Sequence, residues 1–247
     1  MAENILIVHG WMHSAARYGR LKRDLENQRA CHVELYEFSG FGDTPVKYKR
    51  NILDNYVKAM KTYISCHEFD VIIAHSMGGN IVLKAVAQEN PKCKKLVLLS
   101  PVYKGIEFLK PFLFLYPLGI GGINLLKCPC WSSDFLIKIM SLLTINHWRD
   151  IDKQILLDVR KADSTVAARS LFELAFDSWK VKDSAFCCKV NLLLGEKDRV
   201  ISKKKMRNLQ QDLGGCKVQV FPNIGHTAVT EDYERLFDTI AKIIWED

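Results

Sequence analysis

The pentapeptide Ala74-His75-Ser76-Met77-Gly78 directly follows the apolar run Val71-Ile72-Ile73, and its residue types fit a reactive serine. Small residues lie two positions before and after the serine. This spacing predicts a tight strand-to-helix turn, because bulkier side chains would clash where the backbone reverses. Such a turn holds the serine in a strained, exposed conformation at the end of a strand. The pattern therefore predicts a nucleophile that attacks a carbonyl carbon.

A serine hydroxyl is a poor nucleophile at neutral pH, so it needs a base that removes its proton. His226 is the candidate base, because a histidine has a pKa near neutral pH. Asp198 is the candidate carboxylate that would fix the tautomer of this histidine and stabilise its charged form. Both residues follow predicted strands, Val190–Leu194 and Lys217–Phe221. The carboxyl ends of parallel strands share one edge of a sheet, so we expect Ser76, His226 and Asp198 to meet there.

Other interpretations of these residues are open at this point. Asp198 could cap a loop or pair with Arg199, and Asp183 and Glu196 are competing carboxylates. His226 could be an ordinary core histidine. The competing carboxylates do not follow a strand at the same distance, so Asp198 is the preferred choice.

The developing oxyanion of an acyl-transfer reaction needs hydrogen-bond donors. We expect the backbone N–H groups of Trp11 and Met77 to be those donors. Gly10 lets the backbone approach the substrate closely, and Met77 begins a helix, where free N–H groups and the helix dipole favour negative charge. The Trp11 ring is also a candidate for the pocket wall. His9 and His75 are expected to be structural or to line the pocket.

Short apolar runs rich in β-branched residues alternate with helical patterns along the chain. This alternation is typical of an α/β protein with a mostly parallel central sheet and helices on both faces. Apolar residues at helical spacing between Ile52 and Ile64, and from Ile81 to Gln88, predict two of these helices. The predicted strands are Ile5–His9, His32–Phe38, Val71–His75, Lys95–Ser100, Val190–Leu194 and Lys217–Phe221.

The last predicted helix has apolar residues at the same spacing between Leu236 and Ile244. Thr230 is its expected N-cap, and the acidic Glu231 and Asp232 would occupy its first turn, where they stabilise the helix dipole.

The stretch from Val102 to Lys180 shows no clear strand and offers several helical pieces. We interpret residues 102–180 as a helical cap inserted into a core formed by residues 1–101 and 181–247. The first part of the insertion, from Phe108 to Leu126, is strongly apolar. Prolines and glycines interrupt it, which disfavours a membrane span. It predicts a cap helix packed on the core, an apolar roof for the acyl pocket, or a lid that faces lipid.

Composition sets the class of protein. The chain has 247 residues, of which 48% are hydrophobic and 26% are charged, as expected for one globular α/β domain. The net charge is +7, but the lysines form no stripe with interleaved aromatic residues, so nucleic-acid binding is not indicated.

The cysteines and the N-terminus indicate the compartment. Neither Cys128-Pro129-Cys130 nor Cys187-Cys188 has the spacing of a zinc or redox site. We therefore expect free thiols in a reducing environment. The N-terminus carries no secretory signal pattern, and we expect a cytoplasmic protein.

Taken together, these motifs resemble the α/β-hydrolase superfamily, of the serine esterase and lipase type, along the whole chain. The matching segments are His9-Gly10, Ser39-Gly40-Phe41-Gly42-Asp43, Ala74 to Gly79, Leu96 to Pro101, Gly195 to Asp198 and Gly225-His226. The run from His13-Ser14 to Arg17-Tyr18, with Leu21 and Leu25, is similar to monoacylglycerol lipases and lysophospholipases. The resemblance implies hydrolysis of a small ester through an acyl-enzyme, without a metal or an organic cofactor. Ala74 departs from the family pattern at the position of its usual first glycine.

The leading hypothesis is a hydrolase of carboxylic esters with apolar acyl groups. A thioesterase or an amidase would use the same residues. A carbon–carbon bond hydrolase is disfavoured, because such family members tend to carry Asn before the serine and Trp after the histidine, where this chain has His75 and Thr227. The alternative that is not an enzyme is a protein of the same fold that only binds small molecules. The sequence leaves the oligomeric state and the acyl chain length open.

Overall fold

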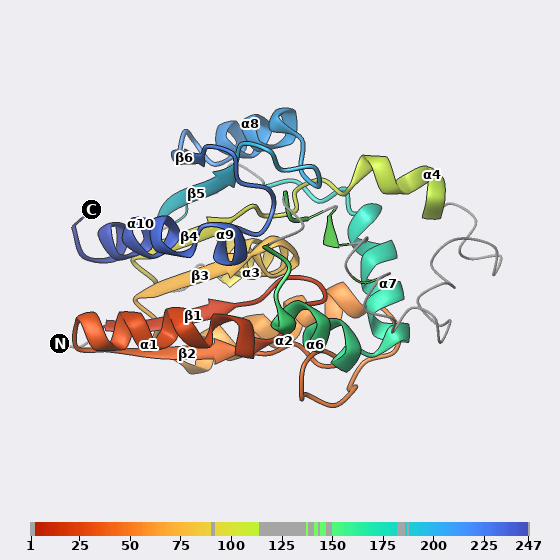
Figure 1. Ribbon diagram of the computed structural model, residues 1–247, viewed down its shortest axis with the longest axis horizontal. Coiled ribbons are helices and arrows are strands. Elements are labelled where there is room, and N and C mark those ends of the chain that lie inside the picture. The colour runs from red at the N-terminus through yellow and green to blue at the C-terminus, as the bar shows by residue number, and fades with distance from the viewer. Residues whose placement is uncertain are drawn as a thin grey trace.

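The computed structural model describes residues 3–89, 92–113, 137, 141–142, 144–146, 150–181, 186 and 188–246. A sheet of six strands lies at its centre, in the order β2-β1-β3-β4-β5-β6 (Figure 1), and every neighbouring pair is parallel. The fold class and all six predicted strands are therefore confirmed, two of them with the predicted bounds and the others with ends shifted by one or two residues. The strands are β1 (Glu3–Val8), β2 (Cys31–Tyr36), β3 (Val71–His75), β4 (Lys95–Leu99), β5 (Lys189–Gly195) and β6 (Lys217–Phe221).

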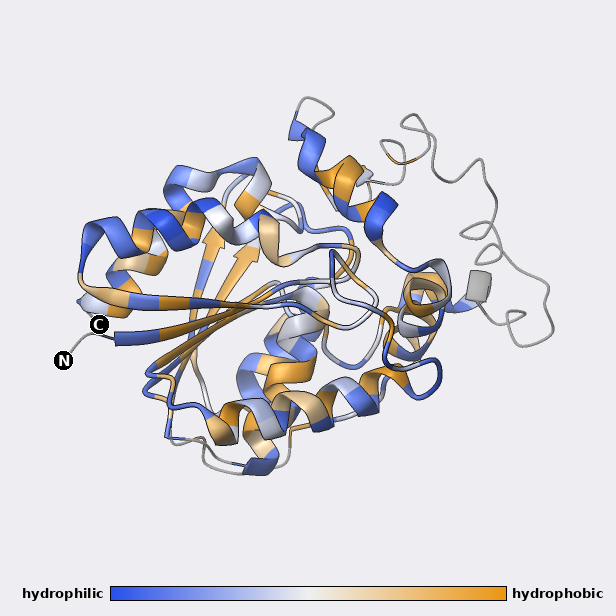
Figure 2. Ribbon diagram, turned by 90° about the horizontal axis from the view of Figure 1, so that it is seen from below, coloured by the Kyte–Doolittle hydropathy of each residue, from blue (hydrophilic) through white to orange (hydrophobic). Residues whose placement is uncertain are grey.

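Helices cover both faces of this sheet. Successive strand residues point to opposite faces, so Ile72 and Ala74 pack into one hydrophobic cluster and Val71 and Ile73 into another. Figure 2 shows the apolar residues along the strands and on the inward sides of the helices. The first cluster is covered by α2 (Ile52–Cys66), α3 (Ser76–Glu89) and α8 (Lys203–Asp212), and the second by α1 (Gly19–Gln28) and α10 (Tyr233–Trp245).

The predicted start of the last helix is wrong. Thr230 and Glu231 belong to a separate short helix, α9 (Ala228–Glu231), and α10 begins after it. The backbone of Asp232, with φ −152° and ψ 71°, interrupts the two helices, and its side chain caps α10 by accepting from Arg235 N–H. Thr230 instead accepts a hydrogen bond from Arg17. Tertiary contacts therefore outweigh the local capping pattern.

The segment between β4 and β5 contains helices and, among its described residues, no strand. The helices in its described part are η2 (Glu107–Leu109), α4 (Lys110–Leu113), α6 (Lys153–Lys161) and α7 (Ser164–Ala175). The side chains of Asp152 and Asp163 cap α6 and α7 by accepting from backbone N–H groups three residues later. Residues 114–126 of the apolar run lie outside the described residues, as do Cys128, Cys130, Asp183 and Cys187.

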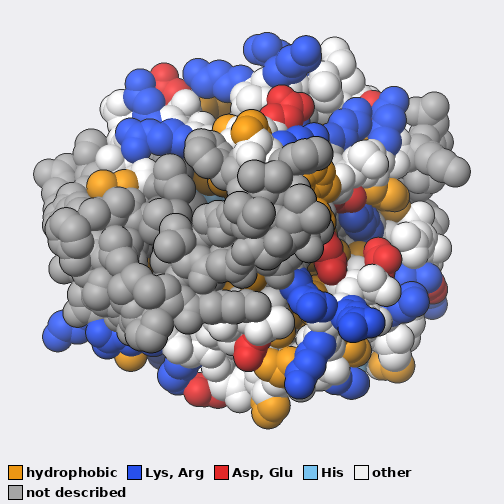
Figure 3. All heavy atoms as spheres, turned by 90° about the vertical axis from the view of Figure 1, so that its right-hand side faces the viewer, with side chains coloured by type: hydrophobic (Ala, Val, Ile, Leu, Met, Phe, Trp, Pro, Cys, Tyr) orange, Lys and Arg blue, Asp and Glu red, His pale blue; other side chains and the backbone are white. Residues whose placement is uncertain are grey.

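Figure 1 places α4, α6 and α7 beyond the carboxyl ends of the strands. Figure 3 looks onto that end of the molecule and shows basic and acidic side chains interleaved around it, in the part of the surface that the structure describes. None of the described helices is long and apolar enough to cross a membrane. None of the five described cysteines, Cys31, Cys66, Cys93, Cys188 and Cys216, is part of a disulfide.

Candidate active site

Ser76 lies at the junction of β3 and α3, in a strained conformation. Its φ of 52° falls in the left-handed region, which is unfavourable for a residue with a side chain. The turn is packed tightly, because a Cβ atom at Gly78 would lie 2.3 Å from the carbonyl oxygen of His9. Ser76 is only 7% exposed. It lines a pocket while being largely covered, and the prediction that the serine is exposed is wrong.

The side chains of Ser76, His226 and Asp198 form a hydrogen-bonded chain. Ser76 Oγ lies 2.8 Å from His226 Nε2, and His226 Nδ1 lies 2.7 Å from Asp198 Oδ2. A carboxylate only accepts hydrogen bonds, so Nδ1–H donates to Asp198 and leaves Nε2 free to accept the serine proton. The structure thus brings together the three residues that the sequence indicated, from loops up to 150 positions apart.

Asp198 is held as an ionised acceptor. Its Oδ1 accepts hydrogen bonds from the backbone N–H groups of Val200 and Ile201, at 2.8 and 2.9 Å. Burial alone would raise the pKa of Asp198, but the His226 imidazole and these two donors outweigh it and lower the pKa below its ordinary value. A charged carboxylate at this position favours the His226 tautomer that can accept a proton from Ser76.

The loops that carry Asp198 and His226 are pressed together at the ends of β5 and β6. A Cβ atom at Gly195 would lie 1.8 Å from the carbonyl oxygen of Gly225, so only a glycine fits at this position. The N–H of Lys197 also donates to the carbonyl of Ile224, at 2.8 Å.

Glu196, the described competitor for the acid, and Arg199, the possible partner of Asp198, make other contacts. Glu196 accepts from Asn223 N–H at 3.1 Å and does not bind His226. Arg199 does not pair with Asp198: its side chain donates to Leu142 O at 3.0 Å and to Asn146 Oδ1 at 3.2 Å.

The loop after β1 lies directly against the serine turn. A Cβ atom at Gly10 would be 2.7 Å from His75 Nδ1 and 3.1 Å from Ser76 Cβ. This packing alone requires a glycine at position 10, independently of the expected close approach to a substrate. The next residue is Trp11, and Met77 is the second residue of α3, whose first N–H groups have no acceptor within the helix.

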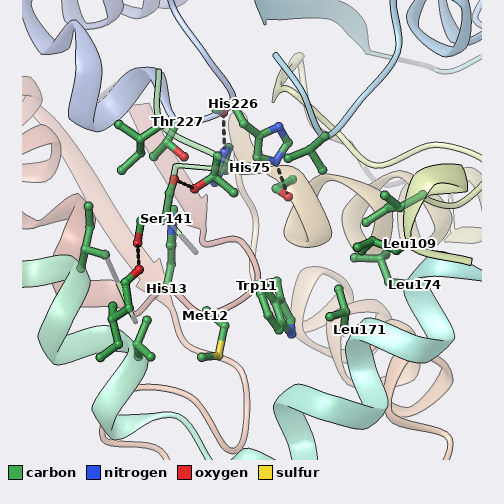
Figure 4. Close-up of a pocket in the computed structure, with 18 of the residues that line it drawn as sticks. Trp11, Met12, His13, His75, Leu109, Ser141, Leu171, Leu174, His226 and Thr227 are labelled. Atoms are coloured by element: carbon green, nitrogen blue, oxygen red, sulfur yellow. Dashed lines mark hydrogen bonds between the residues drawn. The ribbon is translucent and has the colours of Figure 1, made fainter. Parts of the chain in front are cut away.

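The indole of Trp11 joins this loop to the segment between β4 and β5. Its Nε1–H donates to Ala167 O on α7 at 3.0 Å, and the residue lines the pocket. The ring is therefore part of the pocket wall, which the sequence left undecided. Figure 4 shows Trp11 facing Leu171 of the same helix.

His9 and His75 support the backbone around the serine. His9 Nδ1–H donates to Gly10 O at 2.8 Å and Nε2 accepts from Phe38 N–H at 3.0 Å. His75 Nε2–H donates to the carbonyl of His226 at 3.1 Å. Burial, together with the nearby His226, lowers the pKa of His75 to about 3, so its ring is neutral near pH 7.

His13 is a pocket residue that the sequence analysis did not assign. Its ring stacks on that of His75, with centroids 5.2 Å apart, and burial lowers its pKa well below the usual value. Its place in the His13-Ser14 to Arg17-Tyr18 run was the available signal. In the same run, Ser14 Oγ and Arg17 Nε donate to the buried carboxylate of Asp158 on α6, at 2.5 and 2.8 Å.

The serine opens onto a cavity of about 150 Å³ with a polar end and an apolar body (Figure 4). Its polar lining residues are Ser76, His226 and Thr227 together with His13, His75, Ser141 and Thr144. Among the described residues, no Asp, Glu, Lys or Arg lines the cavity, which suits an uncharged ligand. The apolar body is formed mainly by residues between β4 and β5: Ile106, Phe108, Leu109, Ile137, Ile145, Ile155, Val159, Leu171 and Leu174. No group of three or more His, Cys, Asp or Glu suited to a metal ion occurs in the described part of the chain.

A parallel sheet with a serine in a strained turn after β3, and with an acid and a histidine after β5 and β6, defines a hydrolase architecture. The sequence profile of the α/β hydrolase fold matches residues 3–233, so the chain belongs to this family. A search of curated proteins finds no match to the sequence. Membership of this family supports hydrolase activity.

Several solved structures share the fold at low sequence identity. A thermophilic esterase from Thermogutta terrifontis is 17% identical, with a TM-score of 0.72 over 99% of this chain and 90% of the other. A carboxylesterase structure from Nitrososphaera gargenis is 15% identical, with a TM-score of 0.73 over 98% and 90%. The 2-hydroxy-6-oxo-6-phenylhexa-2,4-dienoate hydrolase from Rhodococcus sp. strain RHA1 is 15% identical, with a TM-score of 0.74 over 98% and 90%.

Proposed function

We propose that the protein is a serine hydrolase that cleaves carboxylic esters with apolar acyl groups. The observation that carries this proposal is the hydrogen-bonded chain from Ser76 through His226 to Asp198 at the polar end of an apolar cavity. The esterase and carboxylesterase among the similar structures favour the same chemistry.

The reaction would proceed through an acyl-enzyme. His226 Nε2 takes the proton of Ser76 as Oγ attacks the ester carbonyl, and Asp198 stabilises the resulting imidazolium. The N–H groups of Trp11 and Met77 stabilise the tetrahedral oxyanion. His226 then gives its proton to the leaving alcohol, and a water molecule activated by the same imidazole releases the acid.

The apolar body of the cavity would receive the acyl chain. Its lining residues, several of which belong to η2, α6 and α7, lie mainly within residues 102–180, so we assign this range as a cap on a core of residues 1–101 and 181–247. Burial of each methylene in such a wall favours binding by about 0.8 kcal/mol. Activity is therefore expected to rise with acyl length until the cavity is full.

The test compares p-nitrophenyl esters of graded acyl length with wild-type protein, Ser76→Ala and Ser65→Ala. Ser65 is an exposed serine at the end of α2 and serves as the matched control. Ser76→Ala is expected to lower kcat by about 10⁴-fold or more, and Ser65→Ala to leave it unchanged. Equal turnover by wild-type protein and Ser76→Ala would refute the proposal.

A fluorophosphonate probe separates the alternatives. Labelling at Ser76 is expected for any serine hydrolase, and absence of labelling of the folded protein would favour a non-catalytic binder. Thioesters, amides and carbon–carbon substrates in the same panel rank the remaining chemistries, which share these residues.

A further inference from the structure

The carboxylate of Glu231 lies behind the loop that carries His226. It accepts hydrogen bonds from the backbone N–H of Gly225, at 3.0 and 3.1 Å, and from that of Thr227, at 3.4 Å. Gly225 and Thr227 are the two residues that flank His226. One side chain therefore binds the backbone on both sides of the histidine.

The same carboxylate reaches the segment between β4 and β5. Glu231 Oε2 accepts from Asn146 N–H at 2.8 Å, and Asn146 Nδ2–H donates to Asn223 O at 3.1 Å. The N–H of His226 donates to Thr144 O at 2.8 Å. The three consecutive N–H groups of residues 225–227 thus end on Glu231 and Thr144.

Gly225 has no room for a side chain at this junction. A Cβ atom there would lie 2.9 Å from Glu231 Oε1, 3.0 Å from Thr144 O and 3.2 Å from Asn146 N. These are the same groups that bind the loop, so the absence of a side chain at Gly225 lets these hydrogen bonds form. On the other side, His75 Nε2–H binds the carbonyl of His226, which fixes the remaining backbone group of the base.

We propose that Glu231 is the positioning residue of the base. Its carboxylate fixes the backbone around His226 so that Nε2 stays within reach of Ser76 Oγ, and it ties this loop to residues 144–146. Arg199, next to Asp198, donates to Leu142 and Asn146 of the same segment. The loops of the acid and of the base are therefore both hydrogen-bonded to this segment. This inference rests on the proposed function.

The test uses Glu231→Ala and Glu231→Gln, with Glu234→Gln as the matched control. Glu234 lies three residues later, with a side chain 74% exposed and paired with Arg20. Active sites are counted by titration with a fluorophosphonate, and kcat per titrated site is measured with a short and a long acyl ester. Misplacement of a catalytic group by about 1 Å costs on the order of 100-fold in rate.

Glu231→Ala is expected to lower kcat per titrated site by about 10- to 100-fold, equally for both esters and with little change in KM. Glu231→Gln is expected to recover part of this loss, because its remaining oxygen still accepts from Gly225 and Thr227 while its NH₂ group faces Asn146 N–H. Glu234→Gln is expected to match wild-type protein.

A kcat per site that is unchanged in both Glu231 variants, with only a lower melting temperature, would overturn the inference. A loss confined to KM for the long ester would overturn it as well, since Glu231 would then only shape the acyl pocket. If Glu231→Ala fails to fold, Glu231→Gln carries the test through its rate and through faster amide exchange in residues 222–232. Wild-type protein without esterase activity would instead refute the proposed function.

Discussion

The buried ion pair between Arg17 and Asp158 makes a sharp prediction about stability. Asp158 is 1% exposed and accepts from Arg17 Nε at 2.8 Å, from Ser14 Oγ at 2.5 Å and from Gln154 Nε2 at 2.7 Å. The Arg17 side chain is 3% exposed, and its other acidic neighbour, Asp152, is 3.6 Å away and half exposed. Removal of the Asp158 charge would therefore leave a guanidinium buried with little compensation.

Asp158→Asn is expected to lower the free energy of unfolding by about 3–5 kcal/mol, the cost of breaking a buried pair from one side. Replacing both partners with apolar residues of similar size, Arg17→Met with Asp158→Leu, removes both charges. Such replacements are often neutral or stabilising, so the double variant is expected to recover most of the loss. Urea unfolding of the wild type, Arg17→Met, Asp158→Leu and the double variant gives the coupling energy directly.

The exposed pair between Arg20 and Glu234 provides the control. Their side chains are 54% and 74% exposed, so Arg20→Met is expected to change the unfolding midpoint little. The reasoning would be refuted if Asp158→Asn unfolded at the wild-type midpoint with unchanged amide exchange in α6. It would also be refuted if the two single losses simply added in the double variant.

Two further predictions concern the residues around the serine. Asp198→Asn is expected to lower kcat by about 10³- to 10⁴-fold through the wrong His226 tautomer; kinetics on a short ester measures this, and a loss of less than tenfold would contradict the assigned role. The pKa values of His9, His13 and His75 are lowered by burial, so the unfolded chain binds protons below about pH 6.5 that the folded chain does not. Stability is therefore expected to fall as pH drops below 6.5, by up to about 1.4 kcal/mol per pH unit for each histidine. Urea unfolding between pH 7.5 and 5 measures how the free energy of unfolding changes with pH. His75→Gln is expected to reduce this pH dependence by the contribution of one histidine, and an unchanged dependence would contradict this account.

The sheet and the placement of the three candidate catalytic residues at one edge were predictable because they depend on local signals. Each strand is a short apolar run, and strand order in a parallel sheet places Ser76, Asp198 and His226 at one edge. The small residues around Ser76 predicted the turn. The structure shows why they are needed, because a Cβ atom at Gly78 would clash with Val8 of β1 and with His9, which follows it. These features follow from chain geometry within a few residues of each strand end.

Other features depend on contacts between distant residues and leave no local pattern. Arg17 and Asp158 are 141 positions apart, and each alone is typical of an exposed helix residue. Glu231 fits the first turn of a helix by sequence, yet its side chain turns back to Gly225 and across to Asn146. The burial of Ser76 was missed for the same reason, because the pocket around it is lined largely by residues of a separate segment.

The contacts of the segment between β4 and β5 argue that it does more than enclose a ligand. Ala167 holds the ring of Trp11, next to one expected oxyanion donor, and Asp158 holds the loop that follows. Thr144 binds the backbone of His226 itself, at 2.8 Å. The loops that carry the proposed base and the proposed oxyanion donor therefore each have a hydrogen-bond partner in this segment. Since the proposed reaction requires both loops in place at once, it couples the order of this segment to the geometry of the site.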